Sequence, residues 1–305
     1  MTGAAVEVVD LRKSYGPLQA VRGISFTVEE GEVFALLGPN GAGKTTTVEI
    51  LEGFRKRDSG RVSVLGFDPA TGDRRLKVQM GIVLQTSGVD PYLTVGETID
   101  MFRGYYPKPR SRDEVVKLVG LEDKRDVRVT RLSGGQRRRL DVAIALAGDP
   151  RVLFLDEPTT GFDPGAKRNA WEVIKGLAGL GKTIFLTSHS MDEVQYLADR
   201  VVIIAAGNIV AQGTPQSLVS AGPATTTVRF RAPQVPLPEN FPAAAHVEGE
   251  MVELETEDAT RTLYELTSWA VQSGISLDGL QVTRPSLEDV YLEITGEVEE
   301  AGAKT

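Results

Sequence analysis

One short stretch, residues 38–46, limits the possible fold more than any other part of this 305-residue chain. It fits the pattern G-x-x-x-x-G-K-[ST] at every fixed position. The apolar run 33–37 before it reads as a buried strand, and residues 46–52 after it read as a helix. This order predicts a phosphate-binding loop, with a plain glycine-rich turn before a helix as the alternative. The loop consists of Gly38, Pro39, Asn40, Gly41, Ala42, Gly43, Lys44, Thr45 and Thr46.

The chemistry of this loop suits a nucleotide. Its glycines let the backbone turn so that successive N–H groups point inward, and the following helix start adds a partial positive charge. Lys44 has the length to reach β- and γ-phosphates, and the Thr45 hydroxyl can hold Mg²⁺. We therefore expect a nucleotide to bind here.

Two further apolar runs end in side chains suited to the same chemistry. Residues 152–155 run directly into Asp156 and Glu157. Because open α/β sheets bind ligands at the carboxyl ends of their strands, we expect Asp156 to face a metal and Glu157 to polarise water. Solvated charge at a strand end is the alternative. The short strand predicted at 81–85 ends in Gln85, which can reach Mg²⁺ and the attacking water.

A histidine and a tyrosine are further candidates for the site. His189 follows the apolar run 182–187, so we expect its ring in the same crevice, although a lone histidine is more often a surface or core residue. Tyr15 is a candidate platform for adenine because a purine stacks on an aromatic face. A tyrosine before a glycine is, by itself, more often a loop anchor.

Between residues 86 and 150 the apolar spacing becomes that of helices. Apolar residues recur at Val95, Ile99 and Phe102, and again at 115–119, which predicts a helical subdomain inserted into the nucleotide fold. Near its end, a serine and two glycines open an amphipathic helix. Such a start can bind a second anion, or it can be a plain helix cap. The residues concerned are Ser133, Gly134, Gly135 and Gln136.

The rest of the chain predicts a second, smaller domain. A hairpin across Gly207-Asn208 and a short helix near 215–219 end the first domain. Strand and helix patterns restart at residue 226 and continue to a closing helix near 286–294. This α+β pattern is long enough for a small independent core. The expected domains are 1–221, with the helical subdomain at about 86–150, then 222–296, and then a polar tail at 297–305.

Composition disfavours several classes of function. The net charge of −8 disfavours nucleic acid as the main partner. The chain has no cysteine, which suits a reducing compartment, and its two histidines are too few for a histidine-rich metal site. No run approaches the roughly 18 apolar residues of a membrane span, and the N-terminus lacks a signal pattern. We expect a soluble protein that meets a membrane only through a partner.

Together these motifs resemble the ATP-binding subunit of an ATP-binding cassette (ABC) transporter, over about residues 1–220. Leu-Ser-Gly-Gly-Gln at 132–136 matches the family signature, and 152–158 matches its metal-carboxylate strand with the catalytic glutamate. Phe162 departs from the usual leucine but stays bulky and apolar. The other matches are Tyr15 at the adenine-stacking position, 38–46 at the phosphate loop, Gln85 at the glutamine lid, Asp163 in the interface loop and His189 at the switch histidine.

The resemblance implies a fold, a reaction and a second copy of the cassette. The fold is an α/β P-loop NTPase with an inserted helical subdomain, followed here by a small α+β domain. The implied ligands are ATP and Mg²⁺, with the metal held by Thr45, Gln85 and Asp156. Water attacks the γ-phosphate, with Glu157 as the base and His189 holding the γ-phosphate. The signature of one cassette then closes on the phosphate loop of an identical or homologous cassette, so that two ATP molecules lie between them.

The segment 285–292 resembles the closing segment of bacterial drug-, antibiotic- and polysaccharide-export cassettes, whose membrane permease is a separate chain. This implies a cytoplasmic protein, peripheral on the inner face of the membrane, that contacts its permease through residues 86–110, around Tyr92 and Leu93. An ABC importer ATPase and a soluble cassette ATPase without a transport role are the alternatives. The sequence does not name the cargo, because the permease selects it.

Overall fold

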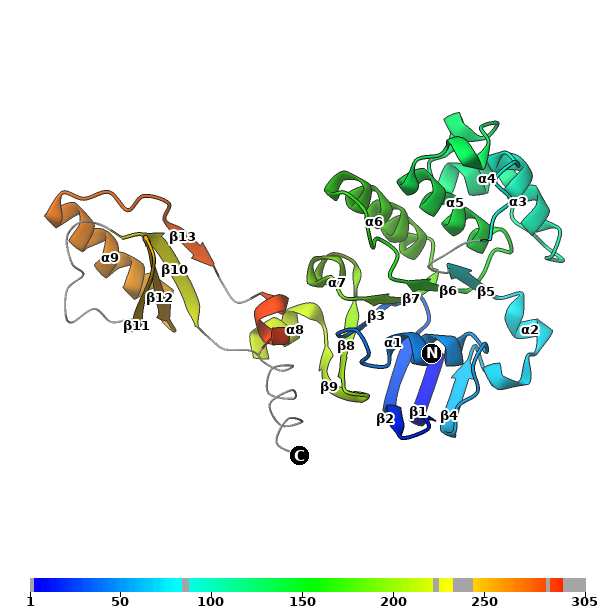
Figure 1. Ribbon diagram of the computed structural model, residues 1–305, viewed down its shortest axis with the longest axis horizontal. Coiled ribbons are helices and arrows are strands. Elements are labelled where there is room, and N and C mark those ends of the chain that lie inside the picture. Colours follow the sequence, from blue (N-terminus) through cyan, green and yellow to red (C-terminus); the bar gives the residue numbers. More distant parts are fainter. Residues whose placement is uncertain (1–2, 84–87, 222–224, 233–243, 284–285, 293–305) are drawn as a thin grey trace. The chain divides into compact units, whose positions relative to one another are not determined.

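The structure is a computed structural model that describes residues 3–83, 88–221, 225–232, 244–283 and 286–292. The chain divides into two compact units, the first ending at Pro215 and the second beginning at Gln216 (Figure 1). The division falls at the start of α8 (Pro215–Ala221), whereas the sequence pattern placed the boundary at the end of this helix.

A six-stranded sheet forms the centre of the first unit. Its strand order is β5-β6-β7-β3-β8-β9, and all neighbouring strands are parallel except β8 and β9. Every residue of β3 and β7 is buried, as expected for parallel strands covered on both faces. The strands are β3 (Val33–Leu37), β5 (Met80–Val83), β6 (Val152–Asp156), β7 (Thr183–Ser188), β8 (Arg200–Ala205) and β9 (Asn208–Gly213).

A second, antiparallel sheet with the order β2-β1-β4 packs on the other side of α1 (Lys44–Leu51). The helix contacts β2 and β4 of this sheet and β6 of the central sheet. Phenylalanines from both sheets stack in the shared core; Phe26 and Phe34 have ring centroids 5.3 Å apart. These strands are β1 (Ala4–Tyr15), β2 (Leu18–Glu29) and β4 (Ser59–Val64).

The helical subdomain lies between β5 and β6 in the chain, and each of its three α-helices begins with a capping box. In each box, a Thr or Ser hydroxyl accepts from a backbone N–H while a Glu or Gln side chain accepts in return. The helices contact one another, and α5 also contacts β5 (Figure 1). They are α3 (Val95–Arg103), α4 (Arg112–Leu118) and α5 (Gly134–Leu146), preceded by the short α2 (Arg74–Lys77).

Two helices follow the carboxyl ends of β6 and β7. α6 (Pro164–Gly179) packs on α7 (Met191–Leu197), and α7 packs on β3 and β7. Among the described residues, no helix combines the length and apolar character needed to cross a bilayer.

The second unit has an antiparallel sheet with the order β11-β12-β10-β13 and one long helix against it (Figure 1). Its core cluster joins β10, β12 and the helix through Val228, Phe230, Val252, Leu254 and Leu266. Residues 287–292 form a further helical segment. The elements are β10 (Thr226–Arg231), β11 (Ala244–Glu248), β12 (Met251–Thr256), α9 (Ala259–Ser273) and β13 (Gln281–Thr283).

Candidate active site

The predicted phosphate loop connects β3 directly to α1, and two of its glycines are required by close backbone approaches. A Cβ on Gly38 would lie 2.4 Å from the carbonyl oxygen of Ile204. A Cβ on Gly43 would lie 2.4 Å from the carbonyl oxygen of Ala20, and the φ of Gly43 is +104°. Side chains at either position would displace the loop, since such contacts are far below van der Waals distance.

Lys44 at the start of α1 is only 5% exposed. Its ammonium donates to the carbonyl oxygens of Gly38 at 2.7 Å and Pro39 at 3.2 Å, so it lies across the loop itself. Burial lowers the pKa of Lys44, and the carboxylates of Glu157 and Asp156 oppose that shift. A buried cation held near the loop amides is well placed for a phosphate.

Glu157 lies between Lys44 and His189. Its Oε1 is 3.9 Å from Lys44 Nζ and 3.2 Å from His189 Nδ1. The backbone of Glu157 is left-handed, with φ +45°. Residues other than glycine adopt this conformation only under constraint. Its N–H donates to the carbonyl and hydroxyl oxygens of Thr187, at 3.2 and 3.1 Å, and Thr160 donates to its Oε2. The structure therefore brings together Lys44, Glu157 and His189, predicted from three separate motifs.

Asp156 ends β6 beside this group, and the Thr187 hydroxyl donates to its Oδ1. Thr45, whose hydroxyl is the second predicted metal ligand, is exposed at the start of α1. A carboxylate and a hydroxyl are hard oxygen donors, which fit Mg²⁺ bound mainly by phosphate and water. Burial, together with the carboxylates of Asp156 and Glu49, raises the pKa of Glu52 at the end of α1 to about 8.

Two predicted contacts are not decided by this geometry. Tyr15 ends β1 with its ring part exposed, and the Arg55 guanidinium and Lys13 ammonium lie 5.2 and 5.6 Å from the ring centroid. These cation–π contacts hold the ring, and its role as an adenine platform stays a prediction. Gln85 lies outside the described residues.

The predicted signature forms a separate pocket of about 650 Å³ with the loop that leads to α6. None of the described residues that line this pocket belongs to the phosphate loop. Ser133 and Gly134 are exposed, and Ser133 also caps α5 by accepting from Gln136 N at 3.3 Å. Asp163 caps α6 through its Oδ1, which accepts from the N–H groups of Gly165 and Ala166. The signature thus faces outward from this chain.

Sequence patterns missed several side chains that support the site. Arg138 of α5 bonds to the turn after β6, and the buried Glu193 of α7 bonds to Thr159 in the same turn. One sequence signal could have revealed Glu193: it is a charged residue among the buried apolar residues of its helix, next to Val194 and one turn from Leu197. Arg138 had no such signal, since arginines flank it on both sides.

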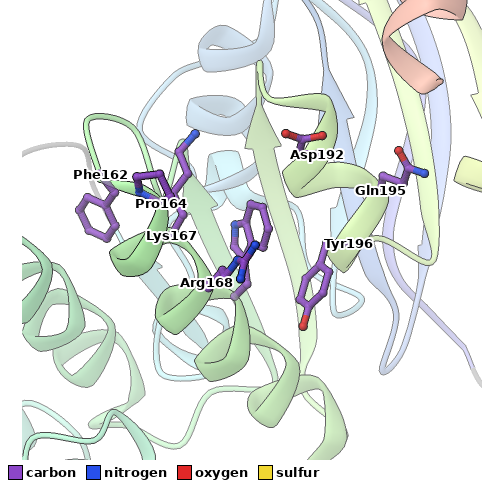
Figure 2. Close-up of a pocket in the computed structure, with 8 residues that line it drawn as sticks. Phe162, Pro164, Lys167, Arg168, Asp192, Gln195 and Tyr196 are labelled. Carbon is purple, nitrogen blue, oxygen red and sulfur yellow. The ribbon is translucent and has the colours of Figure 1, made fainter. Parts of the chain in front are cut away.

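Another pocket, of about 660 Å³, lies along α6 and α7 (Figure 2). It is lined by Phe162 and Pro164, by the cationic side chains of Lys167 and Arg168, and by Trp171 and Tyr196, whose rings stack with centroids 5.0 Å apart. None of the predicted nucleotide contacts is among the described residues that line it.

The fold and these residues define a class of protein, the P-loop ATPase cassette of ABC transporters. The family model described as ABC transporter matches residues 21–160. A second model, described as the C-terminal domain of ABC transporter domain-containing protein-like, matches residues 226–286.

Similarity to individual proteins gives a more specific comparison. It is 36% identical over 302 residues to the Nod factor export ATP-binding protein I of Rhizobium meliloti (strain 1021), covering 96% of this chain and 88% of that protein. The protein of the same name from Rhizobium sp. (strain N33) is 37% identical, over 97% of this chain and 98% of its own length. The chain therefore belongs to the ATP-binding proteins of ABC transporters, and it binds and hydrolyses ATP.

Solved structures agree on the fold. The ATP-binding subunit of an ABC transporter matches with a TM-score of 0.63 and 26% identity, over 71% of this chain and 92% of its own. A bacterial ABC transporter cassette, solved as a dimer, matches with a TM-score of 0.61 and 22% identity, over 68% of this chain and 98% of its own.

Proposed function

We propose that this chain is the ATPase subunit of an exporter whose membrane permease is a separate protein. The observation that carries the ATPase part of the proposal is the convergence of Lys44, Glu157 and His189 at the carboxyl edge of the central sheet. Relatives named as export proteins match nearly the whole chain, which favours export over import. The cargo class that we propose, from the resemblance of 285–292, is a drug, an antibiotic or a lipid-like molecule.

In the proposed mechanism, Lys44 and the loop amides bind the β- and γ-phosphates, which neutralises the charge that develops during phosphoryl transfer. Glu157 orients or deprotonates the attacking water, and His189, which contacts Glu157, holds the γ-phosphate. Thr45 and Asp156, together with Gln85, hold Mg²⁺, which supplies further positive charge to the phosphates when bound. Tyr15 stacks on the adenine.

We propose further that two cassettes form an ATP sandwich. Ser133 and Gly134 are exposed, Gly135 and Gln136 are half-buried, and the helix start that they form suits a phosphate. A phosphate loop covers only one side of a triphosphate, so an outward signature complements the loop of a second copy or a homologous cassette. Asp163, in the exposed loop beside the signature, belongs to the same proposed interface.

The helical subdomain is the proposed contact with the permease, and through it this protein lies at the cytoplasmic face of the membrane. Tyr92 is 73% exposed and precedes α3, while Tyr105 follows α3 and is 68% exposed. Large exposed aromatic side chains on one subdomain suit an interface.

The site assignment is tested by Glu157→Gln. Glutamine keeps the shape of the side chain but removes the carboxylate, so we expect ATP binding to persist and turnover to fall at least a hundredfold, on the order typical for loss of a general base. Steady-state turnover and equilibrium binding of ATP are measured in parallel. Parental turnover in this variant would show that another group activates water.

The export proposal is tested by co-purification with the membrane protein encoded next to this chain. A six-span permease without a substrate-binding protein fits export, and its presence should raise the ATPase rate when transported molecules are added. A partner that works with an external substrate-binding protein would establish the importer alternative. Binding to ribosomes or DNA in place of a permease would establish the non-transport alternative.

A further inference from the structure

The turn that carries Glu157 is held by an arginine from another helix. Arg138 of α5 donates from Nη2 to the carbonyl oxygen of Asp156 at 3.0 Å and from Nε to that of Pro158 at 3.2 Å. These two carbonyls stand immediately before and after Glu157. A planar guanidinium with fixed donors spans both at once, which an ammonium cannot do.

A buried glutamate holds the far side of the same turn. Glu193 of α7 is 1% exposed, and its Oε1 accepts from Thr159 Oγ1 at 2.7 Å and from Trp171 Nε1 at 3.1 Å. Trp171 is itself held in place, since its ring stacks on that of Tyr196 in the wall of the pocket along α6 and α7.

The charge of Arg138 is offset by several nearby carboxylates. The Arg138 side chain is 11% exposed and lies 3.9 Å from Asp141. Burial lowers the pKa of Arg138, while the carboxylates of Asp141, Asp156 and Glu193 act in the opposite direction. A guanidinium this buried is stable only with its partners in place, so Arg138 has little freedom to leave them.

Rigidity matters here because of the backbone of Glu157. A left-handed glutamate is strained and persists only where its surroundings determine it. We propose that Arg138 and Glu193 are positioning residues that hold Glu157 in this conformation, aimed at Lys44 and His189. The signature forms the start of α5, and Arg138 belongs to the same helix. Arg138 therefore couples the position of Glu157 to the position of α5. The proposal rests on the assignment of Glu157 as the group that activates water.

Arg138→Ala tests the positioning role of Arg138. We expect kcat to fall by about ten- to a hundredfold, as for misplacement of a catalytic group by about an ångström, with KM for ATP within about twofold of the parent. Arg138→Lys, which reaches fewer carbonyls, should lie between. The matched control is Arg57→Ala, which removes a part-buried arginine bonded to Asp68 and to the carbonyl of Gly60, and whose kcat should stay parental.

Glu193 offers a sharper comparison, because one oxygen accepts both of its hydrogen bonds. A glutamine amide oxygen can accept the same two bonds, so Glu193→Gln should keep kcat within about threefold of the parent, whereas Glu193→Ala should lose tenfold or more. A merely structural role would instead rank the variants by their unfolding temperature.

Failure of this inference is distinct from failure of the site assignment. If Glu157→Gln abolishes turnover but Arg138→Ala keeps the parental kcat, the positioning role of Arg138 is wrong. If Glu193→Gln falls as far as Glu193→Ala, its role as an acceptor is wrong. If Glu157→Gln itself turns over at the parental rate, the assignment of the base is wrong instead.

Discussion

At the residue scale, the carboxyl end of β6 brings several acids near one buried cation. Asp156 and Glu157 both act on Lys44, and Asp156 also raises the pKa of Glu52. A bound triphosphate would add further negative charge to this region. Glu52 relieves part of the repulsion by holding a proton at neutral pH, since burial keeps its pKa at about 8.

This proton gives a testable pH dependence. The folded-state pKa of Glu52 is raised from 4.5 to about 8, so its contribution to stability is complete below pH 4.5 and is lost as pH rises through 8. Glu52→Gln removes this dependence. Between pH 5 and pH 9, the free energy of unfolding of the variant should therefore rise relative to that of the parent by about 4 kcal/mol.

Urea unfolding in EDTA, without nucleotide, measures this difference. The chain has two tryptophans, Trp171 in the first unit and Trp269 in the second. A Trp269→Phe background therefore reports on the unit that contains Glu52. Parallel pH profiles for parent and variant would contradict the prediction.

The residues to which we assign phosphate binding and water activation were predictable from sequence, because each stands at a fixed place relative to an apolar strand. Lys44, Glu157 and His189 all follow this rule, and the structure brings them together. Arg138 and Glu193 were not predictable, because their roles depend on which turn a helix face meets after folding. No local pattern encodes that contact.

At the element scale, the start of α5 has two separable tasks. Ser133 caps the helix, and its N–H donates to Gln136 Oε1 at 3.0 Å to complete the capping box. In the proposed dimer the same exposed residue meets a phosphate of the partner site. Capping tolerates a carboxylate, because Asp caps as well as Ser does, whereas a phosphate repels one.

Ser133→Asp should therefore separate the two tasks. We expect stability within about 1 kcal/mol of the parent, together with a loss of ATP turnover of tenfold or more. The matched control is Ser111→Asp in the similar capping box of α4, which should change neither quantity. Thermal unfolding and ATPase assays measure both. Parental turnover by Ser133→Asp would mean that this helix start meets no phosphate.

Elements were predicted well in type and less well at their ends. The helix after the phosphate loop was expected at 46–52, but α1 runs from Lys44 to Leu51. The hairpin was expected to turn at Gly207-Asn208, but β9 already begins at Asn208. The turn is Ala206-Gly207, both left-handed with φ of +46° and +81°, and only long-range pairing reveals an alanine in that conformation.

At the scale of the whole molecule, the two units have separate cores. Phe230 is fully buried among Val228, Val252, Leu254 and Leu266. Phe230→Ala should destabilise the second unit by about 3–5 kcal/mol, as for other buried Phe→Ala changes. Unfolding followed through Trp269 should shift accordingly, while the Trp171 transition and ATP binding stay parental. A shift of both transitions together would show that the units unfold as one.

The proposed sandwich predicts that one complete site requires two chains. Glu157→Gln traps bound ATP, so with ATP and Mg²⁺ it should have the mass of a dimer by light scattering, and with ADP that of a monomer. Adding Lys44→Ala disables the phosphate loop, and adding Ser133→Asp instead disables the signature. Either double variant should stay monomeric alone.

Mixing the two double variants should restore dimers, because the intact loop of the Ser133→Asp chain meets the intact signature of the Lys44→Ala chain. One ATP is then bound per dimer, and its affinity should be weaker than with two composite sites, since only one of the two contacts remains. A site completed within a single chain would give no such rescue, and the mixture would remain monomeric. The rescue thus separates a shared site from a self-contained one.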